Sequence, residues 1–311
     1  MSAFTELDSS FSPFERALAN PRLRRLTSRT VAWARQHGVL QTAAPSRFAP
    51  MVTVASVYAA LAGPTAAPEE AADLAARFVL LFLSLDDASD AELPDLSDAA
   101  PFQIGPHTPA LAAWLTALTA NRRPSPQLFS SFERGFHDYL RVRRSERADK
   151  AARLTIEAHW ARRRHTIFTE PFIDQWLISM GIDPSVTSPR FSEARRLATD
   201  VVLLSNDLAS AERDAPDGDA PEDLNLIDAY RAERGDAKAD VIEALIELQR
   251  SLAERCRREL DAAVAEAPGP HAAAYEAVVT GLVDGNLEAI SLLDFRYRGV
   301  DAIVARLARL R

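Results

Sequence analysis

FVLLFLSLDDASD, residues 78–90, is an apolar run that ends in a cluster of aspartates. Pro68 and two glutamates precede it. A proline in the first turn with acids beside it is a typical helix start, because the free N–H groups there carry partial positive charge. The pattern therefore predicts a largely buried helix from Pro68 to Leu85, with the aspartates at its C-terminal end.

The three aspartates of this stretch lie where negative charge is unfavourable. Asp86 and Asp90 are four residues apart, so they share one face of a continuing helix, with Asp87 beside them. The C-terminal end of a helix is already partly negative, and a bound cation would relieve the conflict. Oxygen donors suit a hard ion such as Mg²⁺, which also binds phosphate oxygens. The alternative interpretation is a solvated acidic loop after a core helix.

The rest of the sequence is also helical in composition. Ala and Leu dominate its 311 residues, Gly accounts for only 11, and alternation of β-branched residues is nearly absent. We find no internal repeat and no linker between domains. The sequence therefore predicts an all-α fold with a single helical domain over residues 14–311, after a flexible segment at residues 1–13.

Proline, glycine and apolar periodicity indicate where the other helices lie. The expected ranges are Phe14–Gly38, a helix around Trp114, Pro126–Arg144, Ala148–Phe168 with a break or kink at Pro171, Ser192–Arg213, Asp240–Glu266, His271–Phe295 and a short Val300–Leu310.

Charge and cysteine content exclude several classes of function. With 36 Lys and Arg against 44 Asp and Glu, the net charge is −8, which argues against general binding to nucleic acid or to an anionic membrane. The one cysteine, Cys256, cannot form a disulfide framework or a cysteine-rich metal site. The longest apolar run is too short to span a bilayer, and the first residues lack the pattern of a signal peptide. We expect a cytoplasmic protein without stable membrane insertion.

A second set of oxygen donors follows another apolar run, Val201–Ser205. Asn206, Ser210 and Asp214 are spaced i, i+4 and i+8, so they line one helix face over about 12 Å. The pattern repeats the first one, in which an apolar helix carries oxygen ligands at its C-terminal end. Ordinary polar residues late in a helix are the alternative interpretation.

Arginines near two helix ends could bind diphosphate, the anion that would accompany magnesium at such acidic sites. Arg162, Arg163 and Arg164 are consecutive and point in different directions around a helix, so at most two can face one pocket. Arg296 and Tyr297 form a later pair. A planar guanidinium donates in pairs to diphosphate and stays charged. A basic surface patch or a helix cap remains the alternative.

Two acidic sites together with separate arginines match what a magnesium–diphosphate complex requires. Aromatic side chains on the same or neighbouring helices would then line an apolar cavity, since π faces stabilise cations. Each of these aromatics could equally be an ordinary core residue. The candidates on the helices carrying the motifs are Phe82, Trp160, Phe172 and Trp176.

These motifs together make the chain resemble a bacterial class I terpene synthase over nearly its whole length. The family's aspartate-rich DDxxD motif is matched by Asp86, Asp87 and Asp90, after an aromatic at Phe82. Its NDxxSxxxE motif is matched by Asn206, Asp207 and Ser210, with Asp214 where Glu is usual. An RRxT-like stretch, Arg163-Arg164-His-Thr166, holds a diphosphate-sensing arginine that the resemblance places at Arg164. The late Arg-Tyr pair is matched by Arg296 and Tyr297.

The chain departs from the family pattern at three positions. Asp214 is one methylene shorter than the usual Glu. Phe168, counted among the substrate-binding residues, replaces the helix-breaking glycine that usually follows the sensor by four residues. The tryptophan that often precedes the Arg-Tyr pair is absent from residues 291–295. These changes affect the expected pocket wall and mode of cyclisation more than the metal chemistry.

The resemblance implies a class I helical bundle around a central apolar cavity and three bound Mg²⁺ ions, for which Mn²⁺ could substitute. The implied reaction is ionisation of an allylic prenyl diphosphate to a terpene hydrocarbon, with diphosphate released. Phe168 favours a C20 diterpenyl substrate, already bicyclic and supplied by a separate class II cyclase; a prenyltransferase would supply a linear substrate. A sesquiterpene synthase acting on farnesyl diphosphate is the alternative. A homodimer is left open.

Two further classes remain in competition. An isoprenyl diphosphate chain-elongating synthase would share the helical fold and DDxxD, but it should carry a second aspartate-rich motif instead of Asn206, Ser210 and Asp214. A non-catalytic helical scaffold would not respond to magnesium and pyrophosphate added together.

Overall fold

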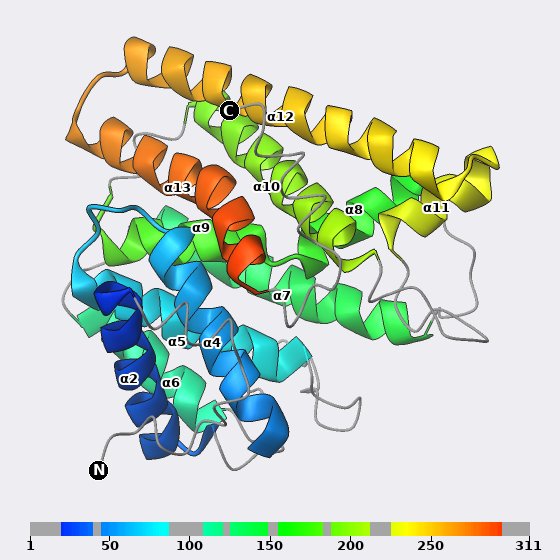
Figure 1. The fold of residues 1–311 in the computed structure, drawn as a ribbon. Helices are drawn as coiled ribbons and strands as arrows, with labels where there is room; N and C mark the ends of the chain where they lie inside the picture. The colour runs from blue at the N-terminus through cyan, green and yellow to red at the C-terminus, as the bar shows by residue number, and fades with distance from the viewer. Residues whose placement is uncertain are drawn as a thin grey trace.

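The computed structural model describes residues 20–39, 45–86, 108–120, 125–148, 155–182, 188–211 and 225–293. Every secondary-structure element within these ranges is an α-helix, which confirms the predicted all-α class (Figure 1). In chain order the helices are α2 (Pro21–Gln36), α4 (Pro45–Leu61), α5 (Glu69–Asp86), α6 (Thr108–Ala120), α7 (Pro126–Ala148), α8 (Ile156–Thr166), α9 (Thr169–Ser179), α10 (Pro189–Ser210), α11 (Leu226–Arg234), α12 (Lys238–Glu266) and α13 (Pro270–Leu292).

Helix α9 lies at the centre of the arrangement. It contacts α5, α7, α10 and α13, and all of its residues except Glu170 are buried. A helix that is apolar on every side is one that neighbours surround. On one side of it, α12 runs along the molecule beside α10 and α13, and on the other α2, α4, α5 and α6 pack together (Figure 1).

The buried side chains form one large cluster and a smaller one. The large cluster draws on both sides of the bundle, and the smaller one joins the C-terminal half of α10 to α11 and the start of α12. Both clusters adjoin α10, so the helix that carries Asn206 and Ser210 is held on several sides by apolar packing.

Several predicted helix ends change in the structure. The expected helix from Ala148 to Phe168 is wrong in extent, because α7 continues to Ala148 and α8 begins only at Ile156. The break before α9 falls at Phe168, and Pro171 lies inside the first turn of α9, where a missing N–H costs nothing.

Local capping explains other ends. Helix α2 begins at Pro21, where the Asn20 side chain accepts from the N–H groups of Arg22 and Leu23. The first part of the expected helix Phe14–Gly38, residues 14–19, lies outside the described residues. Helices α4 and α11 were not predicted from the sequence. Residues 1–13 and the expected helix Val300–Leu310 lie outside the described residues.

Helix α13 approaches the end of α4 so closely that only glycine fits at the contact. A Cβ atom built on Gly285 would lie 1.7 Å from the backbone oxygen of Leu61, and one on Gly281 would lie 2.9 Å from that of Gly63. Neither backbone can move without shifting a helix. The two glycines are one turn apart, so the close contact extends along the face of α13.

We expect Gly285→Ala to destabilise the protein by about 1–3 kcal/mol, the usual cost of overpacking. Urea unfolding followed by circular dichroism measures the change. Gly269→Ala is the matched control, because a Cβ there meets nothing within 4 Å. Equal stability of the two variants would contradict the close approach of α13 to α4.

Candidate active site

An apolar cavity of about 110 Å³ lies between α4, α5, α9, α10 and α13. Its wall includes three of the residues expected from the sequence, Phe82, Phe168 and Phe172. The remaining wall is made by Val54, Tyr58, Phe78, Val79, Leu83, Ile167, Thr169, Val202, Asn206 and Leu282. The cavity thus brings one residue of the second oxygen-donor motif, Asn206, to the same space as the aromatic that precedes the aspartates.

Phe168 reaches this wall through an unusual backbone conformation. Its φ of 58° and ψ of 20° place it in the left-handed region, where a residue other than glycine costs about 1–2 kcal/mol. The ring stacks on Phe82 at 4.6 Å between centroids and on Phe78 at 5.2 Å, and it contacts Tyr139 at 4.8 Å. Aromatic pairs of this kind contribute about 0.5–1.5 kcal/mol each and can offset that strain.

Asp86, the last residue of α5, lies one turn beyond Phe82 and is half-buried. The Tyr139 hydroxyl donates to its Oδ1 at 3.2 Å, and Arg143 Nη2 donates to its backbone carbonyl at 2.9 Å. Arg143 Nε lies 3.5 Å from Oδ1. A cationic side chain from α7 therefore offsets the negative charge that the sequence predicts at this helix end. Asp87 and Asp90 lie outside the described residues.

The second motif lies at the C-terminal end of α10. Asn206 lines the cavity and its Oδ1 accepts from Arg163 Nη2 at 3.2 Å. Ser210 is buried, and its Oγ accepts from Asn225 Nδ2 at 3.2 Å. Asp214, Arg296 and Tyr297 lie outside the described residues.

Asp207, between those two donors, points away from the cavity wall and joins three helices. It is 1% exposed, accepts from Arg163 of α8 through Oδ1, and accepts from the N–H of Leu226 of α11 at 3.0 Å through Oδ2. Burial alone would raise the pKa of this carboxyl, but the charge of Arg163 and the two hydrogen bonds lower the pKa below its ordinary value of 3.8.

The lowered pKa of Asp207 predicts a stability change in acid. A depressed carboxyl pKa stabilises the fold above the unfolded value and loses that effect as pH falls through the folded value. We expect Asp207→Asn to be less stable than the wild type at neutral pH, with the gap shrinking as pH falls below about 4. Thermal midpoints measured from pH 7 to pH 3 test this.

Asp73→Asn is the control for this series. Burial raises the pKa of Asp73 despite its ion pair with Arg29, so its stability gap should change in the opposite direction in acid. A gap for Asp207→Asn that stays constant down to pH 3 would contradict the proposed charge state.

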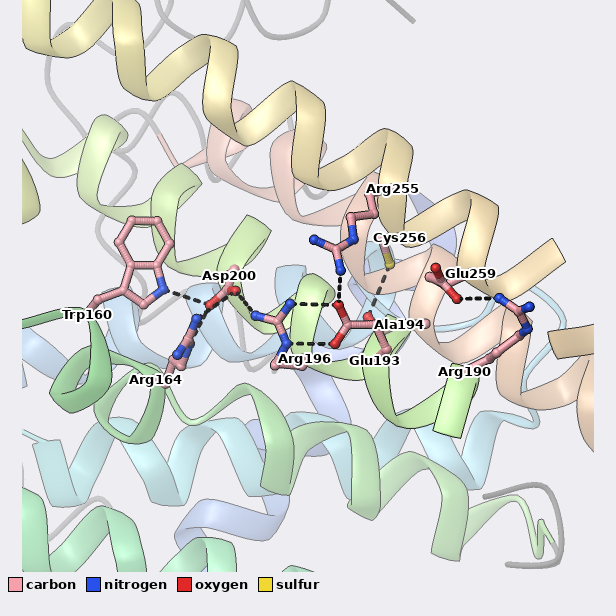
Figure 2. Close-up of polar contacts among 10 residues, drawn as sticks. All are labelled: Trp160, Arg164, Arg190, Glu193, Ala194, Arg196, Asp200, Arg255, Cys256 and Glu259. Atoms are coloured by element: carbon pink, nitrogen blue, oxygen red, sulfur yellow. Dashed lines mark hydrogen bonds and ion pairs between the residues drawn. The ribbon is translucent and has the colours of Figure 1, made fainter. Parts of the chain in front are cut away.

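The two neighbouring arginines of α8 point to different acids. Arg163 reaches Asn206 and Asp207, whereas Arg164 donates to Asp200 through Nε at 2.6 Å and Nη2 at 3.0 Å. Figure 2 shows Arg164 within a chain of ion pairs that continues along α10 through Arg196. Successive helical residues are about 100° apart, which separates the two directions. Arg163 thus contacts the donor motif, and Arg164 contacts Asp200.

Two tryptophans expected in the cavity wall are not among the described residues that line it. Trp160 donates its ring N–H to Asp200 at 2.9 Å, on the side of α8 that faces α10 (Figure 2). Trp176 is fully buried beside Gly63 and meets Phe172 edge-on at 6.2 Å. Both are therefore packed behind the wall.

Sequence reasoning missed three residues that contact the motifs. Tyr139 and Arg143 lie on α7, 53 and 57 positions from Asp86, so no local spacing connects them to it. Asn225 has a local signal, because an Asn directly before an apolar run is a typical N-cap. Its contact with Ser210 joins residues 15 positions apart and has no sequence signature.

The donor chemistry of these motifs fits a hard divalent cation. Asp86, Asn206 and Ser210 each present a side-chain oxygen atom that already accepts a hydrogen bond from a nitrogen or a hydroxyl. Within the described ranges, no group of three or more His, Cys, Asp or Glu side chains forms a metal site. In the same ranges no helix is both long and apolar enough to cross a membrane.

Comparison with known proteins adds independent findings. Residues 110–258, from α6 into α12, match the family described as terpene synthase family 2, C-terminal metal binding. The fold is similar to linalool/nerolidol synthase from Streptomyces clavuligerus in complex with 2-fluorogeranyl diphosphate, with a TM-score of 0.70 and 20% identity over 86% of this chain and 97% of that one.

Two further solved structures share the fold. Germacradien-4-ol synthase from Streptomyces citricolor gives a TM-score of 0.68 at 20% identity, covering 88% of this chain and 96% of that one. The SVS_A2 protein from ancestral sequence reconstruction gives 0.69 at 19% identity, covering 88% and 86%.

Proposed function

We propose that this protein is a class I terpene synthase, a lyase that ionises an allylic prenyl diphosphate at the Asp86–Asn206 end of its cavity. The observation that carries the proposal is the shared wall: Phe82, one turn before Asp86, and Asn206 line the same apolar space. The hydrocarbon chain would occupy that space and the diphosphate its polar end.

The metal sites follow from the same arrangement. Asp86 with Asp87 and Asp90 would hold magnesium on one side, and Asn206 with Ser210 and Asp214 on the other; Mn²⁺ could substitute. When bound, the ions would neutralise the charge of the departing diphosphate. Around them, the apolar wall excludes water from the carbocation, and the stacked rings of Phe82 and Phe168 present π faces that stabilise it.

Arginine side chains would stabilise the diphosphate as its charge grows. We assign this role to Arg163 in place of the sequence-based choice Arg164, because Arg163 already contacts Asn206 whereas Arg164 contacts Asp200. Arg296 and Tyr297 stay in the proposal as further donors.

Two observations favour different substrate lengths. Phe168 in place of glycine favours a bicyclic C20 diphosphate from a separate class II cyclase, which needs little guided folding. The small cavity, about 110 Å³ among the described residues, favours a shorter chain over a bicyclic C20 skeleton. The complex of the linalool/nerolidol synthase with 2-fluorogeranyl diphosphate supports the shorter length.

The proposal is tested by incubating the protein with magnesium and C10, C15, C20 and bicyclic C20 diphosphates. Released pyrophosphate and the extracted terpenes are then measured. We expect turnover of at least one substrate and its loss with EDTA. Added isopentenyl diphosphate should give no longer chains; growth would instead identify an elongating synthase. A protein that binds magnesium and pyrophosphate together should be stabilised by about 2.7 kcal/mol at 100-fold over Kd. A non-catalytic scaffold predicts neither turnover nor this stabilisation.

A further inference from the structure

A reciprocal pair of hydrogen bonds joins the C-terminal end of α10 to the N-terminal end of α11. Asn225 Nδ2 donates to the backbone carbonyl of Asp207 at 2.7 Å, and the N–H of Leu226 donates to the Asp207 side chain at 3.0 Å. The C-terminal end of α10 and the N-terminal end of α11 thus satisfy each other's free backbone groups.

Asn225 does two separate things with its two amide atoms. Its Oδ1 accepts from the N–H of Ile227 at 2.9 Å and so caps α11. Its Nδ2 donates to the Asp207 carbonyl and to Ser210 Oγ at 3.2 Å. The side chain is 4% exposed, so these bonds form away from solvent. Capping needs only an oxygen acceptor. The contact with Ser210 needs an N–H donor at the end of a side chain as long as that of asparagine.

Among the residues that the structure describes, these bonds leave one acceptor position of Ser210 unused. A hydroxyl has one hydrogen and two lone pairs. The Ser210 hydrogen points to the Asp207 carbonyl at 3.5 Å, and one lone pair accepts from Asn225. The second lone pair remains in a fixed direction.

We propose that Asn225 is a positioning residue for the metal site, holding the Ser210 hydroxyl so that its remaining lone pair faces the cation. The inference rests on the proposed function, which makes Ser210 a ligand. Partners that orient a metal ligand typically change metal affinity by about 10- to 100-fold when they are removed.

Asn225→Ser tests this role. Serine keeps a good cap for α11 and is neutral, but it has no amide and is too short to reach Ser210. We expect the magnesium concentration needed for half-maximal thermal stabilisation by magnesium and pyrophosphate to rise about 10- to 100-fold. The magnesium requirement for turnover should rise in parallel. Asn20→Ser is the matched control, since Asn20 caps α2 on an exposed site and should leave the requirement unchanged.

A double variant separates positioning from general loosening. With Ser210 already replaced by alanine, Asn225→Ser should raise the magnesium requirement no further. An unchanged requirement in Asn225→Ser, or an equal additional rise in the Ser210→Ala background, would overturn the positioning role. Asn225→Thr, which also caps, is the second variant if Asn225→Ser does not fold. Failure of the wild type to respond to magnesium and pyrophosphate would instead overturn the proposed function.

Discussion

Asp86→Ala and Asn206→Ala are each expected to reduce turnover of a prenyl diphosphate by about 1,000-fold or more, which corresponds to about 4 kcal/mol of transition-state stabilisation. Asp86 ends α5 one turn beyond the wall residue Phe82, and Asn206 lines the same cavity one turn before the end of α10. Each presents an oxygen atom that could bind a cation. The measurement is steady-state release of pyrophosphate at several magnesium concentrations.

The fold should survive both changes. Asp86 is half-buried at a helix end, and Arg163, the residue that donates to Asn206, keeps its bond to Asp207. Asp73→Ala is the matched control on α5, because Asp73 pairs with Arg29 far from the aspartate end. Wild-type turnover of either Asp86→Ala or Asn206→Ala at limiting magnesium would remove that residue from the metal site.

The turnover of Arg163→Ala is expected to be about 100-fold lower than that of Arg164→Ala, because oxyanion-stabilising donors typically contribute about 100- to 1,000-fold each. Arg164 instead partners the buried carboxylate of Asp200. Its loss should appear mainly as reduced stability, moderated because Arg196 and Trp160 still donate to Asp200.

Arg163→Lys controls for the loss of the Asp207 ion pair. Lysine keeps the positive charge beside Asp207 but not the planar fork that donates in pairs to diphosphate. We expect this variant to unfold near the wild-type temperature and still to show a raised KM for the diphosphate substrate. The reverse pattern, with Arg164→Ala the more impaired in turnover, would return the role to Arg164.

Some residues of the cavity wall were predicted from the sequence, whereas tertiary packing placed others elsewhere. Phe82, Phe168 and Phe172 were expected in the wall and line it. Phe82 and Phe172 reach it from α5 and α9, whereas Phe168 reaches it from the break between α8 and α9. Trp160 on α8 donates to Asp200 and Trp176 on α9 packs against Gly63, so neither ring is among the described residues that line the cavity. Periodicity predicts burial, but it does not tell which neighbour a buried ring meets.

The amino-acid sequence alone determined the helical class, the buried helix that ends at Asp86, and the two oxygen-donor motifs. All of these depend on residues within about two turns of one another, where spacing controls geometry. Tertiary structure decided that Arg163 faces Asn206, that Arg143 accompanies Asp86 and that Asn225 reaches Ser210. Those contacts join helices distant in sequence, and they depend on how whole apolar faces pack, a collective property that no local pattern encodes.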